Sequence, residues 1–171
     1  SGKLWQVARV IARPRYGWEL VRWSHDSRKL LVKALPAGTK LPGGTDKPDK
    51  APVISIYRTD NAPSPSGAQL DAWAQADVTL LDAETGRVTR IAQAVHPCWY
   101  EFAPDDKSIA FATAVLAAGK ITQELRLVST PGGASRTLAR HLQLGFPATS
   151  VSWSPEGQRL AYVSPNGKGR A

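Results

Sequence analysis

The stretch Trp153-Ser-Pro-Glu-Gly-Gln-Arg-Leu-Ala-Tyr162 decides the fold of this chain. It predicts a β-hairpin, because proline presets φ for a tight turn, glycine tolerates a positive φ, and a run of β-forming residues follows. Leu160 and Tyr162 stand two positions apart, so they share one face of the second strand. We expect that face to be buried, and we expect Trp153 to end the first strand and pack under a neighbouring unit.

The same pattern occurs twice more, in Trp23-Ser-His-Asp-Ser-Arg-Lys-Leu-Leu-Val32 and in Phe102-Ala-Pro-Asp-Asp-Lys-Ser-Ile-Ala-Phe111. Each copy, called here an aromatic-led segment, has an aromatic residue, a small residue, a turn with an acidic residue and an apolar run. Three copies in one chain indicate a repeat architecture. By analogy with the third copy, the residues expected to be buried are Trp23, Leu30 and Val32 in the first copy and Phe102, Ile109 and Phe111 in the second.

A second hairpin is predicted after each of the first two aromatic-led segments. Residues Asp77–Ile91 contain two alternating runs around Gly86, and residues Gln123–Leu138 contain two around Gly132 and Gly133. Glycine suits the loop of a hairpin because it adopts a positive φ without strain. Two hairpins give four strands, which is the content of one β-propeller blade.

The third aromatic-led segment resembles the Trp-Ser-Pro-Asp-Gly-Lys-x-Ile-Ala-Phe signature of WD-like propeller repeats. These repeats build TolB-type propellers and the N-terminal propellers of prolyl oligopeptidase-family serine peptidases. The other two copies depart from the signature: His25 stands in place of proline, and Ser27 and Asp106 stand in place of glycine. The departures weaken the turn signal locally without changing the type of turn that it predicts.

The predicted fold is therefore all-β, a partial β-propeller of four-stranded antiparallel blades with about three blade equivalents, starting and ending within a blade. We expect residues 1–171 to form a single propeller fragment. A Ser1-Gly2 start that resembles a protease scar, together with the absence of methionine, also indicates a piece of a longer protein. The expected parts are outer strands at 4–12, one blade at 18–92, the next at 98–140 and a first hairpin at 149–163.

Residues 36–76 form a predicted irregular insertion within a blade. The stretch is rich in proline, glycine and charged residues, with one strand expected at Val53–Tyr57. A Pro-rich loop followed by such a strand is similar to insertions in bacterial prolyl oligopeptidase-like propellers, which favours that family over the compact TolB type. Disorder of residues 38–50 is the competing interpretation. Arg58 and Asp60, with the hairpin tips, are the first contact residues to consider.

The chain has a formal net charge of +8, and the basic character is local. Residues 1–50 hold 11 of the 22 Lys and Arg residues but 4 of the 14 acidic residues. A patch for nucleic acid or another anionic surface is one interpretation. Solvated strand edges are favoured instead, because the aromatic-basic interleaving of RNA-binding sheets is missing, so nucleic acid is not an expected partner. The basic residues concerned are Arg9, Arg13, Arg15, Arg22, Arg28, Lys29, Lys33 and Lys40.

The sequence predicts no catalytic, cofactor-binding or metal-binding residue. A Gly-x-Ser-x-Gly nucleophile elbow is absent, and Gly-Lys pairs at 119–120 and 167–168 lack the other residues of a phosphate loop. The single cysteine, Cys98, cannot form an intramolecular disulfide and is expected to be a packed core thiol. Asp105 and Asp106 are interpreted as turn residues. The residues without metal-ligand spacing are His25, His96 and His141.

Two functions remain open. Resemblance to prolyl oligopeptidases implies a non-catalytic propeller that gates or filters peptides for a hydrolase domain, whose catalytic residues would follow Ala171. Resemblance to TolB implies a scaffold for protein–protein binding. The expected partner is a peptide or protein, and open sheet edges could also pair two copies into a homodimer. No apolar stretch reaches the length of a membrane span, and the compartment stays open between bacterial cytoplasm and periplasm.

Overall fold

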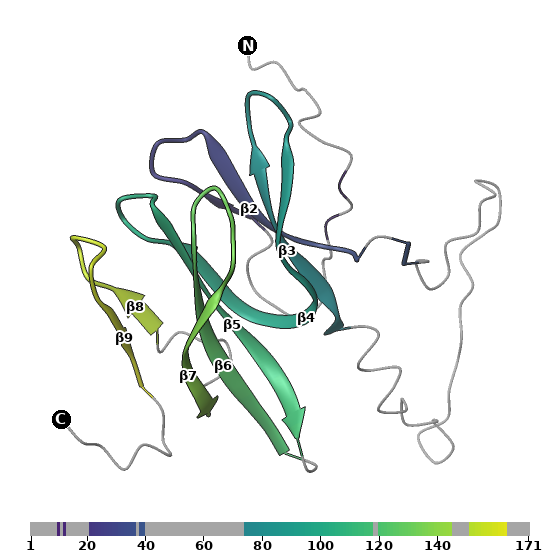
Figure 1. Cartoon of the computed structure of the whole chain (residues 1–171), viewed down its shortest axis with the longest axis vertical. Coiled ribbons are helices and arrows are strands. Elements are labelled where there is room, and N and C mark those ends of the chain that lie inside the picture. Colours follow the sequence, from purple (N-terminus) through teal and green to yellow (C-terminus); the bar gives the residue numbers. More distant parts are fainter. Residues whose placement is uncertain are drawn as a thin grey trace, which may run out of the picture.

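The computed structural model describes residues 10, 12, 21–36, 38–39, 74–117, 120–144 and 151–163. Their regular structure consists of nine β-strands (Figure 1). The strands are β1 (Val21–Trp23), β2 (Lys29–Ala34), β3 (Ala76–Asp82), β4 (Val88–Phe102), β5 (Ser108–Ala117), β6 (Lys120–Ser129), β7 (Arg136–Leu142), β8 (Val151–Trp153) and β9 (Leu160–Tyr162).

Strands β1 to β7 form one antiparallel sheet in which each strand pairs with its neighbours in sequence. Strands β8 and β9 form a separate hairpin. Each aromatic-led segment makes the hairpin that its sequence predicts, as β1–β2, β4–β5 and β8–β9. The predicted hairpins around Gly86 and Gly132 are also present, as β3–β4 and β6–β7. The prediction of an all-β fold class is confirmed, and the sheet is propeller-like because its strands fall into two four-stranded groups.

The longest strand, β4, belongs to both groups. Its residues 88–95 pair with β3 and its residues 96–102 pair with β5. We call β1, β2, β3 and residues 88–95 unit 1, and residues 96–102 with β5, β6 and β7 unit 2. A separation between two blades was expected here, but the structure has one strand that bends where Ala94 has a positive φ of 48°. Because Asp77 accepts the main-chain N–H of Ala94, the bend leaves no unpaired donor there and needs no loop.

The main core lies between the two units. Phe102, Ile109 and Phe111 of unit 2 are at most 2% exposed, which confirms the burial predicted for the second aromatic-led segment. Full burial of one such side chain contributes roughly 1.5–3 kcal/mol to stability. The residues from unit 1 that complete this core are Leu31, Val78, Leu80 and Ile91, and those from unit 2 are Tyr100, Phe102, Ile109, Phe111 and Val128.

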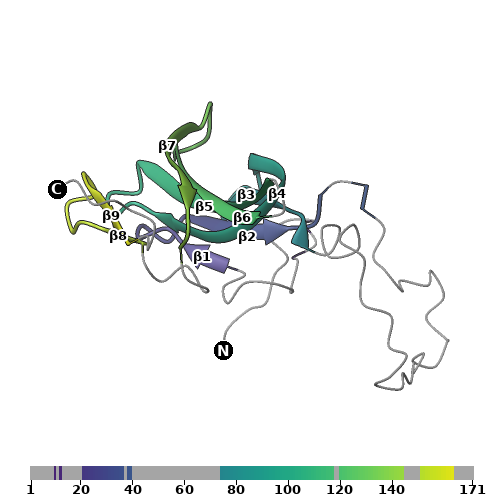
Figure 2. The ribbon, with the colours of Figure 1, turned by 90° about the horizontal axis from the view of Figure 1, so that it is seen from below.

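A second apolar cluster attaches the β8–β9 hairpin to unit 2. Val151 of β8 is buried against Leu125, Leu142 and Leu144, with Leu160 packed at the margin. Figure 2 shows the hairpin beside unit 2. The hairpin therefore continues the order of the repeat: the third aromatic-led segment packs against unit 2, as the second packs against unit 1.

Four residues of the first and third aromatic-led segments are less buried than predicted. Trp23 is 56% exposed, because β1 is the edge strand of the sheet and the described residues place no preceding unit over it. Tyr162 is 44% exposed, and Trp153 and Leu160 are half-buried. Leu30 and Val32, by contrast, are buried as predicted, in a cluster with Leu81 and Val10.

Several predictions concern residues outside the described part of the chain. They are the strands at 4–12 apart from residues 10 and 12, most of the insertion at 36–76 with Arg58 and Asp60, and the Gly-Lys pair at 167–168. Ala12 forms an isolated antiparallel bridge with Ala34 at the end of β2.

Candidate functional site

The clearest candidate site surrounds a buried carboxylate on β3. The side chain of Asp77 is 4% exposed, and its Oδ2 lies 3.1 Å from Nε of Arg90 on β4. Its Oδ1 accepts the main-chain N–H of Ala94 at 2.8 Å. A buried carboxylate requires partners of this kind, because an unpaired charge is costly to remove from water. Asp77 therefore holds the bend of β4 and fixes the position of Arg90.

Arg90 is the accessible half of this pair. Its side chain is 45% exposed, and its contact with Asp77 is made through Nε. No other ion pair or hydrogen bond of Arg90 occurs among the described residues. A guanidinium held in one orientation by a buried acid is suited to bind a carboxylate through two parallel hydrogen bonds.

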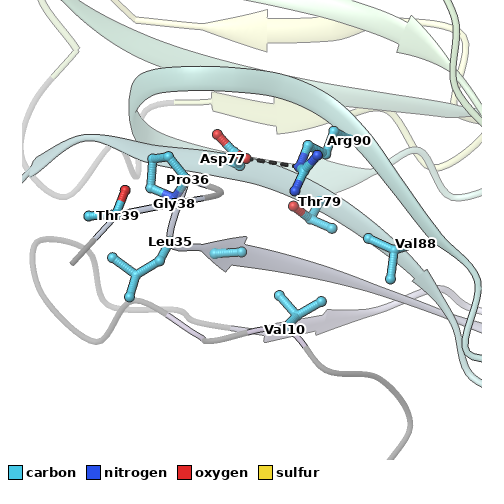
Figure 3. A pocket seen from close by; sticks show the side chains of 10 residues that line it. Val10, Leu35, Pro36, Gly38, Thr39, Asp77, Thr79, Val88 and Arg90 are labelled. Carbon is cyan, nitrogen blue, oxygen red and sulfur yellow. Dashed lines mark ion pairs between the residues drawn. The ribbon is translucent and has the colours of Figure 1, made fainter. Parts of the chain in front are cut away.

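The ion pair lines a pocket of about 240 Å³. The other lining residues come from the end of β2 and the turn after it, from β3 and β4, and from Val10. Figure 3 shows Val10 and Leu35 across the pocket from Asp77, Thr79 and Arg90. The pocket thus combines an apolar wall with one cation. Its volume is slightly below the range of about 300–1,000 Å³ for drug-sized ligands, which suits one side chain or a chain end.

Sequence reasoning missed this pocket. Asp77 and Arg90 were placed in the predicted strands as ordinary hairpin residues, and Asp77 is buried on a strand that lies between β2 and β4. The signal that could have found the site is a single acid in the run Ala76–Leu81, where the other residues are apolar or threonine. A charged residue among residues that are expected to be buried needs a partner of opposite charge. Arg90 lies on β4, the strand that pairs with the strand of Asp77.

A second group of polar contacts links the turns of successive aromatic-led segments. Asp106, in the β4–β5 turn, accepts the N–H groups of His25 and Asp26 in the β1–β2 turn, both at 2.9 Å. In the next turn, a Cβ at Gly157 would lie 3.4 Å from Cδ of Pro104 and 3.5 Å from the main-chain N of Asp105. The fifth residue of an aromatic-led segment, Asp106 in the second copy and Gly157 in the third, therefore lies against the turn of the preceding copy. The interpretation of Asp105 and Asp106 as turn residues is confirmed, since Asp105 accepts the N–H of Lys107.

Cys98 lies in β4, at a register shift between Pro97 and Trp99. Burial raises the pKa of its thiol to about 11, and the nearby charge of Lys33 lowers it only in part. A protonated thiol is a weak nucleophile, so this environment does not activate Cys98. His96 lies in the same strand and His141 in β7. Within the described ranges, no three His, Cys, Asp or Glu side chains gather in a way that could hold a metal ion.

The basic residues of the N-terminal third do not share one environment. Arg28 is exposed and Lys29 is partly exposed, as expected for solvated positions. Lys33 is 2% exposed, so its interpretation as a solvated charge was wrong: it lies on β2, which has a strand on each side and is buried along most of its length. Arg9, Arg13, Arg15 and Lys40 lie outside the described residues.

Comparison of the sequence with models of known families and with curated proteins finds no match. The structure contains no helix, over the residues that it describes, with the length and apolar character to cross a bilayer. Assignment of a function therefore depends on the chemistry of the pocket, the repeat of the strands and the resemblance of the aromatic-led segments.

Proposed function

We propose that this chain is a non-catalytic β-propeller module that binds peptide or protein segments. The observation that carries the proposal is Arg90, held by the buried Asp77 at the wall of a small pocket with an apolar side. The terminal NH₂ groups of Arg90 receive a carboxylate, and Val10, Leu35 and Val88 contact an adjoining apolar group. A peptide C terminus carries both features on neighbouring atoms.

The specific role that we propose is peptide filtering for a prolyl oligopeptidase-like serine peptidase. The support is the Trp-Ser-Pro-Glu-Gly pattern of the third aromatic-led segment and the strand order of the two units. In this role the pocket selects peptides by their free end, and a separate hydrolase domain cleaves them. A TolB-like scaffold that binds a protein partner is the alternative, and the same pocket serves it.

Acetyl-leucine tests the pocket directly, because it joins a carboxylate to one apolar side chain. We expect NMR titration with acetyl-leucine to shift the amide signals of Val88 and Arg90. Acetyl-leucine amide, which has the same side chain without the charge, should bind at least about tenfold more weakly, a difference of roughly 1.4 kcal/mol. Equal shifts with acid and amide would overturn the assignment of Arg90 as the carboxylate contact.

A matched pair of variants separates the pocket from general loss of charge. Arg90→Ala should abolish the response to acetyl-leucine. Arg140→Ala, which removes an exposed arginine 3.6 Å from Glu124 on another strand, should leave it unchanged. The coding sequence downstream of residue 171 distinguishes the two roles, since an α/β-hydrolase segment with a nucleophile elbow supports peptide filtering. Hydrolysis of chromogenic peptide substrates by the chain itself would contradict a non-catalytic role.

A further inference from the structure

The bulge at the bend of β4 has a counterpart in unit 2. In unit 1 the register of β3 with β4 shifts beside Val78, and Ala94 on β4 has a φ of 48°. In unit 2 the register of β6 with β7 shifts beside Leu125, and His141 on β7 has a φ of 55°. Residues other than glycine seldom adopt such a φ, so each bulge needs contacts that hold it.

In unit 1, side chains hold both main-chain polar groups of the bulge residue. Oδ1 of Asp77 accepts the N–H of Ala94 at 2.8 Å, and Nε2 of Gln75 donates to the carbonyl of Ala94 at 3.2 Å. These bonds replace the ladder hydrogen bonds that a bulge interrupts. They keep Ala94 in a conformation that is unfavourable in itself, so loss of either bond favours its return to an extended φ.

The acid that holds this bulge also holds the cation of the pocket. Oδ2 of Asp77 lies 3.1 Å from Nε of Arg90, which lines the pocket. The side chain of Asp77 is 4% exposed, and a side chain packed on all sides cannot readily turn to keep one partner while it gives up the other. The orientation of Arg90 and the bulge at Ala94 therefore depend on the position of one carboxylate.

Unit 2 has the bulge without this link. By the register of the strands, Glu124 of β6 stands in the place of Asp77. Its side chain is 27% exposed and lies 3.6 Å from Nε of Arg140, and within the described ranges it accepts no hydrogen bond from the main chain of His141. The bulge is thus a feature of the repeat, whereas its connection to a pocket cation is specific to unit 1.

The bulge in unit 1 also reaches the core between the units. Ala92 and Val95, on either side of Ala94, pack against that core. Because side chains alternate along a strand, relaxation of the bulge to a regular strand would move Val95 to the opposite face. The bulge therefore determines which side of β4 meets unit 2.

We propose that the bulge at Ala94 is a conformational switch that couples occupancy of the Arg90 pocket to the packing of unit 1 on unit 2. The inference rests on the proposed function, since its ligand is a carboxylate bound by Arg90. Such a ligand requires the oriented guanidinium, which is present only while Asp77 holds the bulge, so binding stabilises the bent form of β4. By linkage, the bent form binds the ligand more tightly by the same factor. Strained main-chain conformations of this kind are common at ligand clamps and switches.

Amide hydrogen exchange of Ala94 tests the coupling from the side of the ligand. With acetyl-leucine at about ten times its Kd, exchange of the Ala94 N–H should slow by about tenfold, because exchange requires the open form and the ligand binds only the bent form. The N–H of Gly157, which donates to the carbonyl of Ser154 in the third turn, is the control and should exchange at an unchanged rate. Equal slowing at both amides would indicate general stabilisation and would overturn the proposal.

Variants test the coupling from the side of the bulge. Ala94→Val places a β-branched residue at a positive φ and should weaken acetyl-leucine binding by at least about tenfold, because the bent fraction falls. Ala94→Gly adopts this φ without strain and should bind at least as tightly as the original chain. His141→Val imposes the same strain on the bulge of unit 2 and should leave the affinity unchanged. If circular dichroism shows that Ala94→Val does not fold, Gln75→Ala replaces it, since it removes the bond to the Ala94 carbonyl.

The outcomes separate this proposal from the one on which it rests. Absence of acetyl-leucine shifts at Val88 and Arg90 in the original chain would overturn both. Those shifts, together with unchanged exchange at Ala94, would overturn the coupling and leave the pocket assignment in place. Equal losses of affinity in Ala94→Val and His141→Val would also overturn the coupling, because the effect of strain would then be general.

Discussion

Oδ1 of Asp106 lies 2.9 Å from both the main-chain N and the ring Nδ1 of His25, a residue 81 positions earlier in the chain. Each of these residues is a departure from the repeat signature, His25 in place of proline and Asp106 in place of glycine. The structure shows that the two departures are complementary. Histidine supplies a main-chain N–H and a ring nitrogen that proline lacks, and aspartate supplies the carboxylate that contacts them. The third turn follows the signature instead, with Gly157 beside Pro104.

This pairing predicts a positive coupling in a double-mutant cycle. Asp106→Gly and His25→Pro should each lower the free energy of unfolding by about 1–2 kcal/mol, because each removes hydrogen bonds between the turns. The double variant restores the Pro/Gly arrangement and should lose about 1 kcal/mol less than the sum of the single losses. Urea denaturation of the four proteins measures the coupling, and strictly additive losses would show that the turns do not interact.

Acid titration should reveal the charge of Asp106. Burial by itself raises the pKa of this carboxyl, but hydrogen bonds from His25 and Asp26 together outweigh burial and hold the pKa below its usual 3.8. A lowered pKa stabilises the folded state above pH 3.8, and this contribution disappears as pH falls through the folded-state value. The difference in unfolding free energy between the original chain and Asp106→Gly should therefore shrink below pH 3.8. A difference that stays constant down to pH 2 would contradict this linkage.

Asp77 should matter far more for stability than exposed charges do. Asp77→Ala leaves the N–H of Ala94 without its acceptor and Arg90 without its ion-pair partner, and we expect a loss of about 2–3 kcal/mol. Glu124→Ala, which removes the partner of Arg140 from an exposed pair, should change stability by less than about 1 kcal/mol. Thermal unfolding followed by circular dichroism compares the two. Similar losses would mean that Asp77 does not hold the bend of β4.

Two adjacent glycines give a test of how unit 2 packs on unit 1. A Cβ at Gly132 would lie 2.9 Å from Cγ2 of Thr89, whereas a Cβ at Gly133 would meet nothing within 4 Å. Both glycines have φ in the region that other residues rarely adopt, 135° and 143°. Gly133→Ala should thus show backbone strain alone, and Gly132→Ala should destabilise by at least about 1 kcal/mol more. Equal effects in denaturation would show that Thr89 moves aside freely.

Cys98 should react slowly in the folded protein. Its pKa is raised by burial from 9.0 to about 11, so at pH 8 the thiolate population falls by about a hundredfold relative to an unfolded chain. The reaction with Ellman's reagent should slow by at least that factor and become fast in denaturant. Because the neutral thiol is favoured by folding, Cys98 contributes stability below pH 9 that is lost as pH rises toward 11. Fast modification of the native protein would show that the thiol is accessible and activated.

The strands of this fold were predictable because their local chemistry repeats. Turn residues such as Gly86 and Gly157 adopt the positive φ that their place in the pattern requires, and the alternating apolar positions at Ile109 and Phe111 are buried. The exposure of Trp23 was not predictable from the pattern. An aromatic residue at this position is buried only if a neighbouring unit packs over it. The repeated pattern predicts the position of the residue and not the presence of that unit.

The candidate site was less predictable than the fold. Asp77 and Arg90 are separated by a whole turn, and only the register of β3 with β4 brings them together. That register is shifted near Ala76 and Val78, so no fixed spacing in the sequence encodes the contact.

Because β4 belongs to both units, it determines whether the two units unfold together or separately. A strand of 15 residues that supplies hydrogen bonds to both units cannot be lost from one of them without loosening the other. Heating should therefore produce a single cooperative transition for the two units, rather than the stepwise fraying of repeats that touch only through side chains. Mechanical tension applied across the sheet would likewise be carried through β4, which acts as a common tether between the Arg90 pocket and the core around Phe111.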